Sequence, residues 1–160
     1  GLPTDTTESF KNSLDSIVRL NAECITVHTL CMKRASRLTT EGVTLDLQQA
    51  RDAREMLAYT QNVLGQNEYI PYYMYRQSRM VGNLENVGWS KRGFESLYNV
   101  YVMDETHTIL ACGSGGVTKL KRNNPDYLER IFNFKYPYEY IDRFDELIQR
   151  KSGIMQFYGQ

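Results

Sequence analysis

A helix followed at once by a short strand constrains the fold of this chain more than any other feature. Asp5 and Glu8 have the spacing of a D-x-x-E capping pair, and the helix that they begin is expected to end at Asn21. Its apolar positions at helical spacing are Phe10, Leu14, Ile17 and Val18. The next stretch, "CITVHTL" (24–30), alternates like a half-buried strand. A helix and a strand in this order are half of a βαβ unit, so the sequence predicts an α/β fold with a strand before Gly1.

A second helix is expected over 45–64, with Gly65 as its stop. Its predicted buried side consists of Leu47, Ala50, Leu57, Ala58 and Leu64. Residues 68–77 are typical of a strand, and Pro71 places that strand at a sheet edge or puts the proline in its first residues. The polar segment 33–42 and the Gly- and Asn-bearing segment 78–93 are expected to be loops.

The second half of the chain has the pattern of an antiparallel sheet. "SLYNVYVM" and "TILAC", joined by the turn "DETH", predict a hairpin, and "VTKL" (117–120) predicts a further strand. A last strand over 127–134 is expected to precede a helix over 138–150. No linker composition separates the two halves, so residues 1–160 are predicted to form one α+β domain.

Composition excludes several classes of protein. Nineteen basic and nineteen acidic residues leave no net charge to attract nucleic acid. No apolar run approaches the roughly 20 residues of a membrane span. The three cysteines form no C-x-x-C pair, which favours a reduced, cytoplasmic setting. Cys24, Cys31 and Cys112 are expected to be small buried side chains.

Two polar features follow the strand 24–30. A lone histidine such as His28 is more typical of a hydrogen-bonded core residue than of a site, although in a barrel it would face the interior. Lys33, Arg34 and Arg37 lie at the carboxyl end of the same strand, where α/β sheets bind ligands. These cations would suit a carboxylate-rich substrate, and a solvated surface patch explains them equally well.

Two further stretches could contact a ligand. "GSGG" (113–116) allows a close approach of the backbone to a ligand, but β-forming residues follow it, so a tight turn is the simpler interpretation. Twelve tyrosines are present, and Tyr72, Tyr73 and Tyr75 lie together before Arg76 and Gln77. Such residues suit a flat, partly polar ligand, and they suit an ordinary half-buried sheet as well.

Four longer stretches carry a more specific signal: "GLPTDTTESFKNSL", "TVHTLCMKRASRL", "PYYMYRQSRMVGNLENVGW" and "YNVYVMDETHTILACGSGG". Together they resemble the carboxyl-terminal half of oxygen-independent coproporphyrinogen III dehydrogenases, in the HemZ-type branch of the radical S-adenosylmethionine enzymes. The resemblance implies a partial (β/α)6 barrel continued by a largely antiparallel sheet and a terminal helix. Residues 1–66 would be the last barrel units and 67–160 the sheet extension.

The same resemblance implies S-adenosyl-L-methionine and a 4Fe-4S cluster in the full-length protein. The C-x-x-x-C-x-x-C motif that binds the cluster is missing from this chain, so no cofactor is expected on the fragment, which should be inert alone. Positions that match cofactor-contacting residues of the family are His28, Cys31, Asn99, Gly113, Gly115, Gly116 and Val117.

The implied reaction is the oxidative decarboxylation of two propionates of coproporphyrinogen III to vinyl groups in haem biosynthesis. The four propionates of that substrate suggest binding roles for Lys33, Arg34, Arg76 and Gln77. "YRQSRM" stands where the best-studied branch has "SNFA", which leaves open whether another tetrapyrrole is the substrate.

Two alternatives remain: a haem- or porphyrin-binding carrier of the same superfamily, and a structural module whose motifs are turns and core. A strand edge left open by truncation would also favour self-association.

Overall fold

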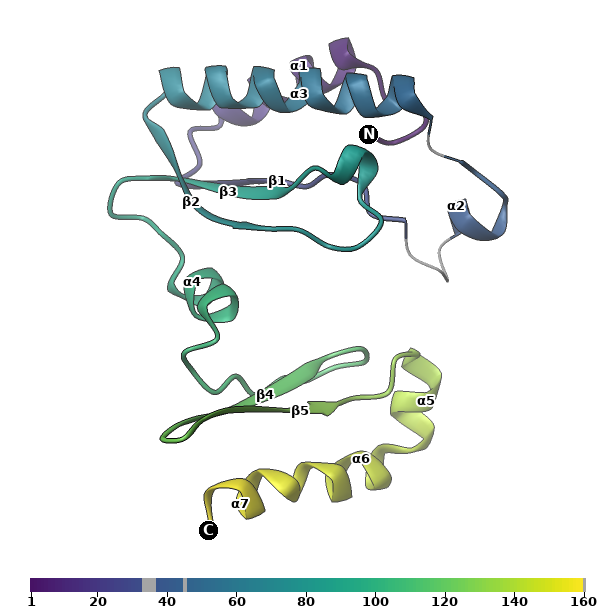
Figure 1. Ribbon diagram of the computed structural model, residues 1–160, viewed down its shortest axis with the longest axis vertical. Coiled ribbons are helices and arrows are strands. Elements are labelled where there is room, and N and C mark those ends of the chain that lie inside the picture. The colour runs from purple at the N-terminus through teal and green to yellow at the C-terminus, as the bar shows by residue number, and fades with distance from the viewer. Residues whose placement is uncertain (33–36, 45, 160) are drawn as a thin grey trace. The chain divides into compact units, whose positions relative to one another are not determined.

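The computed structural model describes residues 1–32, 37–44 and 46–159, which form two compact units, Gly1–Met103 and Asp104–Gln160 (Figure 1). The division at residue 66 that the resemblance implies, between barrel units and sheet extension, stays a prediction. That the whole chain is one domain stays a prediction.

The first helix forms as predicted, with a different cap. Helix α1 (Thr7–Arg19) starts after Thr6, whose side chain accepts a hydrogen bond from the Ser9 N–H while the Ser9 hydroxyl accepts one from the Thr6 N–H. This reciprocal pair replaces the expected pair of Asp5 and Glu8. Leu14 is buried, but Ile17 is 43% exposed. Asn21 ends the helix region as expected, in a left-handed conformation.

Helix α3 (Leu47–Gln66) is capped by Asp46 and Gln49 in the same reciprocal way. Leu47 is 79% exposed and Ala58 is exposed as well, so the predicted buried side was wrong at these two positions. The buried positions of the helix are Ala53, Met56, Thr60 and Leu64. Gly65 does not end the helix, which continues by one residue before the cap at Asn67.

The first sheet has three antiparallel strands in the order β1-β3-β2: β1 (Cys24–Val27), β2 (Tyr69–Tyr75) and β3 (Asn86–Lys91). The segment 78–93 is therefore not a loop as expected, because it contains the central strand and a short 3-10 helix, η1 (Val81–Asn83). The strand β1 ends before His28, shorter than predicted. No parallel pair and no closed barrel occur among the described residues, so the barrel stays a prediction.

Helices α1 and α3 cover one face of this sheet (Figure 1). The alternation of β1 turns Ile25 and Val27 toward these helices. Apolar burial holds the layers together, and the core consists of Leu14, Ile25, Val27, Leu64, Tyr69 and Trp89. The face with Thr26 is left uncovered by α1 and α3.

Two further expectations in the first unit were wrong. Residues 97–104 form helix α4 (Leu97–Asp104) rather than the first strand of a hairpin. The described part of the polar segment 33–42 contains a one-turn helix, α2 (Arg37–Thr40).

The second unit is a hairpin of β4 (Val117–Asn123) and β5 (Asp126–Phe132), and both strands were predicted. Three short helices follow along one face of it (Figure 1): α5 (Pro137–Asp142), α6 (Phe144–Lys151) and α7 (Gly153–Tyr158). One helix was expected there. The chain instead leaves helical geometry at Arg143, with φ −115°. Leu120 and Leu147 are buried in this unit.

Candidate functional site

Hydrogen-bonding and aromatic side chains gather on the sheet face that α1 and α3 leave uncovered. We call the following residues the tyrosine cluster: Thr26, His28, Tyr72, Tyr73, Tyr75 and Asn99. The rings of Tyr72 and Tyr73 meet edge to face at 4.8 Å between centroids, and those of Tyr73 and Tyr75 lie parallel at 6.4 Å. The Thr26 hydroxyl is 3.0 Å from the Tyr73 hydroxyl. The cluster is a row of flat rings with polar edges.

A β-bulge positions Tyr72 within this cluster. The register of β2 against β3 shifts between Pro71 and Tyr73, which re-aims the residue between them. The Asn99 amide of α4 donates a hydrogen bond of 2.8 Å to the Tyr72 hydroxyl. Burial raises the pKa of Tyr72, and the hydrogen bond from Asn99 partly offsets that rise. The phenol is therefore neutral at physiological pH and can donate its proton to an acceptor.

His28 lies at the other end of the cluster. It is exposed, so the expectation of a core histidine was wrong. Its Nδ1 is 3.4 Å from the Tyr75 hydroxyl, and the two rings meet at 70°. A chain of ring contacts and hydrogen bonds through three tyrosines thus connects His28 with Asn99, two of the predicted cofactor residues. Cys31 is not part of this chain of contacts, since its thiol donates to the Ser78 carbonyl at 3.2 Å.

The predicted substrate-binding residues have different outcomes. Arg76 and Gln77 follow Tyr75 directly and line a polar hollow of about 440 Å³. Lys33 and Arg34 lie outside the described residues. Arg37 is exposed and pairs with Glu41 one helical turn later, at 2.9 Å. It therefore already has an anionic partner.

The glycine-rich turn 113–116 lies in the second unit. Gly113 and Gly115 have positive φ angles of 85° and 71°, which few other residues adopt. The Asn133 amide donates to the Gly113 carbonyl at 2.7 Å, and the Gly115 N–H donates to the Phe134 carbonyl at 2.7 Å. The turn thus has a structural explanation for its glycines.

Three further details describe the surroundings of this turn. A methyl group on Gly116 would lie 3.0 Å from the Cys112 carbonyl oxygen and 3.1 Å from the Asn133 amide nitrogen, so Gly116 is a position of close approach. Val117, the last residue matched to the cofactor contacts, begins β4. The Asn133 Oδ1 atom is buried and has no hydrogen-bond partner in the described part of the chain. The role of these residues toward a cofactor stays a prediction.

The three cysteines differ in their burial. Cys24 and Cys31 are half-buried and Cys112 is exposed, so the expectation of three buried side chains was only partly met. The Cys24 thiol donates to the Phe94 carbonyl at 2.9 Å. Across residues 1–32, 37–44 and 46–159, no three His, Cys, Asp or Glu side chains are placed to hold a metal ion. These residues do not fit an iron–sulfur cluster.

One residue of the site was missed in the sequence. Arg79 lines the same hollow as Arg76 and has a positive φ of 65°. The sequence contains no signal for this, because arginine has no preference for left-handed backbone and its position was assigned to a loop.

Comparison with known proteins shows which family the chain resembles. Over 156 residues, 98% of its length, the chain is 35% identical to a Bacillus subtilis (strain 168) protein described as "Oxygen-independent coproporphyrinogen-III oxidase-like protein HemZ". The resemblance to HemZ-type proteins is confirmed. The chain spans 31% of the length of HemZ.

Two other comparisons gave no match. No model of a known protein family matches this HemZ-like chain, and no solved structure matches it. None of the helices in the described part is long and apolar enough to cross a membrane.

Proposed function

We propose that this chain is part of a HemZ-like oxygen-independent coproporphyrinogen III dehydrogenase and supplies part of its tetrapyrrole-binding surface. The observation that carries the proposal is the 35% identity to HemZ along 98% of the chain. On this proposal, residues 1–66 are the last units of a partial (β/α)6 barrel in a cytoplasmic enzyme. Residues 67–160 are its sheet extension.

The tyrosine cluster supports a ligand that contains aromatic rings, such as the pyrroles of a tetrapyrrole. Three phenol rings, of Tyr72, Tyr73 and Tyr75, stand within 6.4 Å of their neighbours between centroids. Aromatic rings pack favourably against the pyrrole rings of a tetrapyrrole, and their hydroxyl groups offer hydrogen bonds at its edge. Binding in this position would hold the substrate beside His28 and Asn99, which are the residues matched to the cofactor contacts.

The carboxylates of the substrate would be bound by cations near the end of β2. Arg76 follows the last residue of β2 and lines the polar hollow together with Gln77. A guanidinium group binds a carboxylate through two parallel hydrogen bonds. Lys33 and Arg34 are proposed to serve the same carboxylates.

The iron–sulfur cluster and the radical reaction are proposed to depend on the rest of the complete protein, since the described residues do not fit an iron–sulfur cluster. S-adenosylmethionine bound to such a cluster supplies the hydrogen-abstracting oxidant in this class of enzyme. The residues of this chain would contact its amino-acid and adenosyl parts through His28, Cys31 and Asn99. The turn residues would do so as well: Gly113, Gly115, Gly116 and Val117.

The oxidative decarboxylation requires the surface to hold each propionate in a fixed position. Each of two propionates would lose a hydrogen atom to the hydrogen-abstracting oxidant and one electron to a separate one-electron acceptor. Its carboxylate would leave as CO2, and a vinyl group would remain. A fixed position of the propionate lowers the barrier by removing the entropy of orientation. The chain alone should bind tetrapyrrole without converting it.

The test is anaerobic incubation of the complete gene product, with reconstituted cluster, reductant and S-adenosylmethionine, with coproporphyrinogen III. The proposal predicts products that carry vinyl groups and lack one or two carboxyl groups by mass spectrometry. Cleavage of S-adenosylmethionine without change of the tetrapyrrole would contradict the proposed substrate.

A haem carrier is the second candidate, and the exposed His28 beside Tyr75 favours it. An imidazole or a phenolate can ligate haem iron. Titration of the chain with haemin and with metal-free coproporphyrin III separates the two functions. A carrier should lose haemin affinity in His28→Ala, whereas a dehydrogenase surface should bind the metal-free porphyrin with little effect of that substitution.

A further inference from the structure

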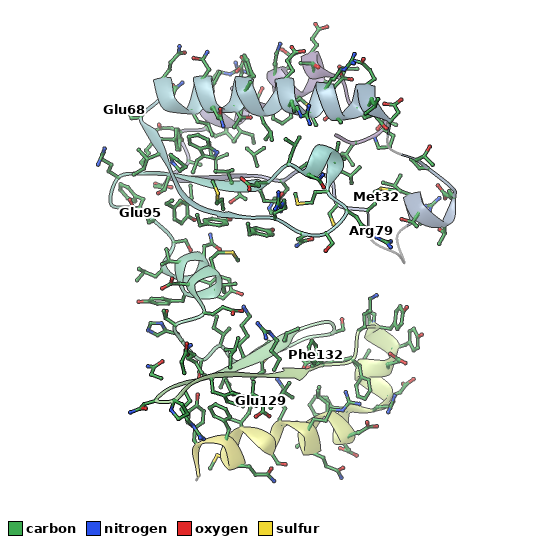
Figure 2. All side chains as sticks on the ribbon, viewed as in Figure 1. Met32, Glu68, Arg79, Glu95, Glu129 and Phe132 are labelled. Atoms are coloured by element: carbon green, nitrogen blue, oxygen red, sulfur yellow. The ribbon has the colours of Figure 1, made fainter. Side chains whose placement is uncertain are left out.

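The loop between β2 and η1 forms a polar hollow, of which the proposed function uses only Arg76 and Gln77. The hollow has a volume of about 440 Å³. It is lined by Arg76, Gln77, Ser78, Arg79 and Asn83. No apolar side chain is among these residues, so the hollow does not suit an aromatic ring and suits a charged group. Figure 2 shows Arg79 beside Met32, at the end of the first unit opposite Glu68.

The backbone of Arg79 is held in a disfavoured conformation. Its φ of 65° brings the Cβ atom close to the following carbonyl oxygen. Its own carbonyl accepts a hydrogen bond from the Met32 N–H at 3.1 Å. On either side, the Ser78 carbonyl accepts from the Cys31 thiol at 3.2 Å, and the Val81 N–H donates to the Leu30 carbonyl at 3.0 Å. Such strain persists only where surrounding contacts impose it, and it is concentrated at functional sites.

The two guanidinium groups of the hollow have no acidic partner among the described residues. Both Arg76 and Arg79 are exposed, and neither takes part in an ion pair with residues 1–32, 37–44 or 46–159. Arg143 and Arg150, by contrast, both pair with Glu146. Two like charges within four residues repel each other, and an anion between them relieves that repulsion. The hollow is therefore electrostatically suited to an anion.

We propose that Arg79, together with Arg76, binds a propionate carboxylate of a tetrapyrrole whose ring lies on the tyrosine cluster. This inference rests on the proposed function and assigns to it a residue that neither the sequence nor the comparison assigns. Tyr75 is the last residue of β2 and Arg76 is the next, about 3.8 Å along the chain, so the residues that line the hollow begin where the row of rings ends. The fixed backbone of Arg79 loses little entropy on binding, so that only its side chain has to be ordered.

The test uses fluorescence titration of the chain with coproporphyrin III and with its tetramethyl ester, which lacks free carboxylates. Arg79→Gln removes the charge and keeps the backbone strain. Arg79→Gly removes the charge and also relieves the strain, because glycine accepts positive φ. Arg51→Gln is the matched charge control on the exposed surface of α3. Glu68→Gly is the matched backbone control, since Glu68 has a φ of 66°.

The inference predicts that both Arg79 variants bind coproporphyrin III about tenfold or more weakly, while both controls bind within twofold of wild type. Wild type should prefer the free acid to the ester, and Arg79→Gln should not. Arg79→Gly should melt at or above the wild-type temperature, as Glu68→Gly should. An unchanged or higher melting temperature of Arg79→Gly would show that the Arg79 side chain does not stabilise the fold, so that its loss weakens binding directly.

Three outcomes would overturn the inference. If wild type binds coproporphyrin III and Arg79→Gln binds it equally, Arg79 has no role and the proposed function stands. Equal binding of acid and ester by wild type would exclude carboxylate recognition. If wild type binds neither, the proposed function fails together with this inference.

Discussion

The ring of Tyr73 lies directly over Gly88 on the adjacent strand. A Cβ atom on Gly88 would come within 1.9 Å of the Tyr73 Cε1 atom, so no other residue fits at position 88 while the ring keeps its place. The two residues are register partners in the β2–β3 pair. The glycine therefore fixes the height at which the central ring of the tyrosine cluster lies above the sheet.

Gly88→Ala should displace the Tyr73 ring and break its contact with Thr26. The crowding should lower the free energy of unfolding by about 1–3 kcal/mol. Denaturant unfolding followed by the fluorescence of Trp89, the single tryptophan of the chain, measures this in the first unit.

The double variant Gly88→Ala, Tyr73→Ala is the control for that prediction. Once the ring is absent, the added methyl group has space, and the alanine at 88 should cost little or even stabilise the strand. Equal costs of Gly88→Ala with and without the ring would contradict the account.

The central strand shows why the sequence predicted only part of this fold. Helix α1 and strand β1 could be predicted because the first shows apolar residues at helical spacing and the second shows them at alternate positions. Residues 86–91 were expected to be part of a loop because the segment 78–93 contains three glycines and two asparagines, whereas Gly88 leaves space for the Tyr73 ring. That contact joins residues fifteen positions apart, and no local pattern reports it.

The site was predictable to a similar degree. The tyrosines and Arg76 were found because they lie together in sequence. Arg79 was missed because its conformation depends on hydrogen bonds to the segment after β1. The cap at Thr6 was missed because Asp5 offered an equally good cap one residue earlier.

Glu105 should make the stability of the second unit depend on pH. Lys119 and Arg130 donate to its carboxylate at 2.7 and 2.8 Å. Its pKa is lowered from 4.5, mainly by the hydrogen bond from Lys119, and burial opposes that shift. A lowered pKa stabilises the folded state above the unfolded value, and this stability is lost as pH falls through the folded pKa.

Glu105→Gln should therefore be less stable than wild type at neutral pH, and the difference should vanish well below pH 4.5. Amide hydrogen exchange at Leu120 of β4 reports on this unit. Glu129→Gln, on β5, is the control for the change of a carboxyl group to an amide. Figure 2 shows Glu129 and Phe132 on opposite sides of the hairpin. A deficit of Glu105→Gln that is constant with pH would contradict the ion-pair explanation.

Gly116→Ala should destabilise the glycine-rich turn. The new methyl group would press on the Cys112 carbonyl and the Asn133 amide, both about 3 Å away. We expect a loss of about 1 kcal/mol or more of unfolding free energy in the second unit, measured by exchange of the β4 and β5 amides. If Gly116→Ala is as stable as wild type, the contact with Asn133 does not constrain the turn.

The free edge of β1 should allow self-association. Within the described residues only β3 pairs with β1, and β1 contains neither proline nor charge. The other edge strand, β2, is protected by Pro71 and its bulge. Sedimentation should show a concentration-dependent dimer that Thr26→Lys weakens and Met74→Lys, on β2, does not. A monomer at all concentrations would contradict this prediction.

The measurement that tests the central claim most directly is the affinity of the chain for coproporphyrin III with and without the rings of the tyrosine cluster. The double variant Tyr73→Leu, Tyr75→Leu should bind at least tenfold more weakly. Tyr59→Leu removes a tyrosine from α3, on the other side of the sheet, and should bind like wild type. Equal affinity of all three proteins for coproporphyrin III would show that the tyrosine cluster is not the tetrapyrrole-binding surface.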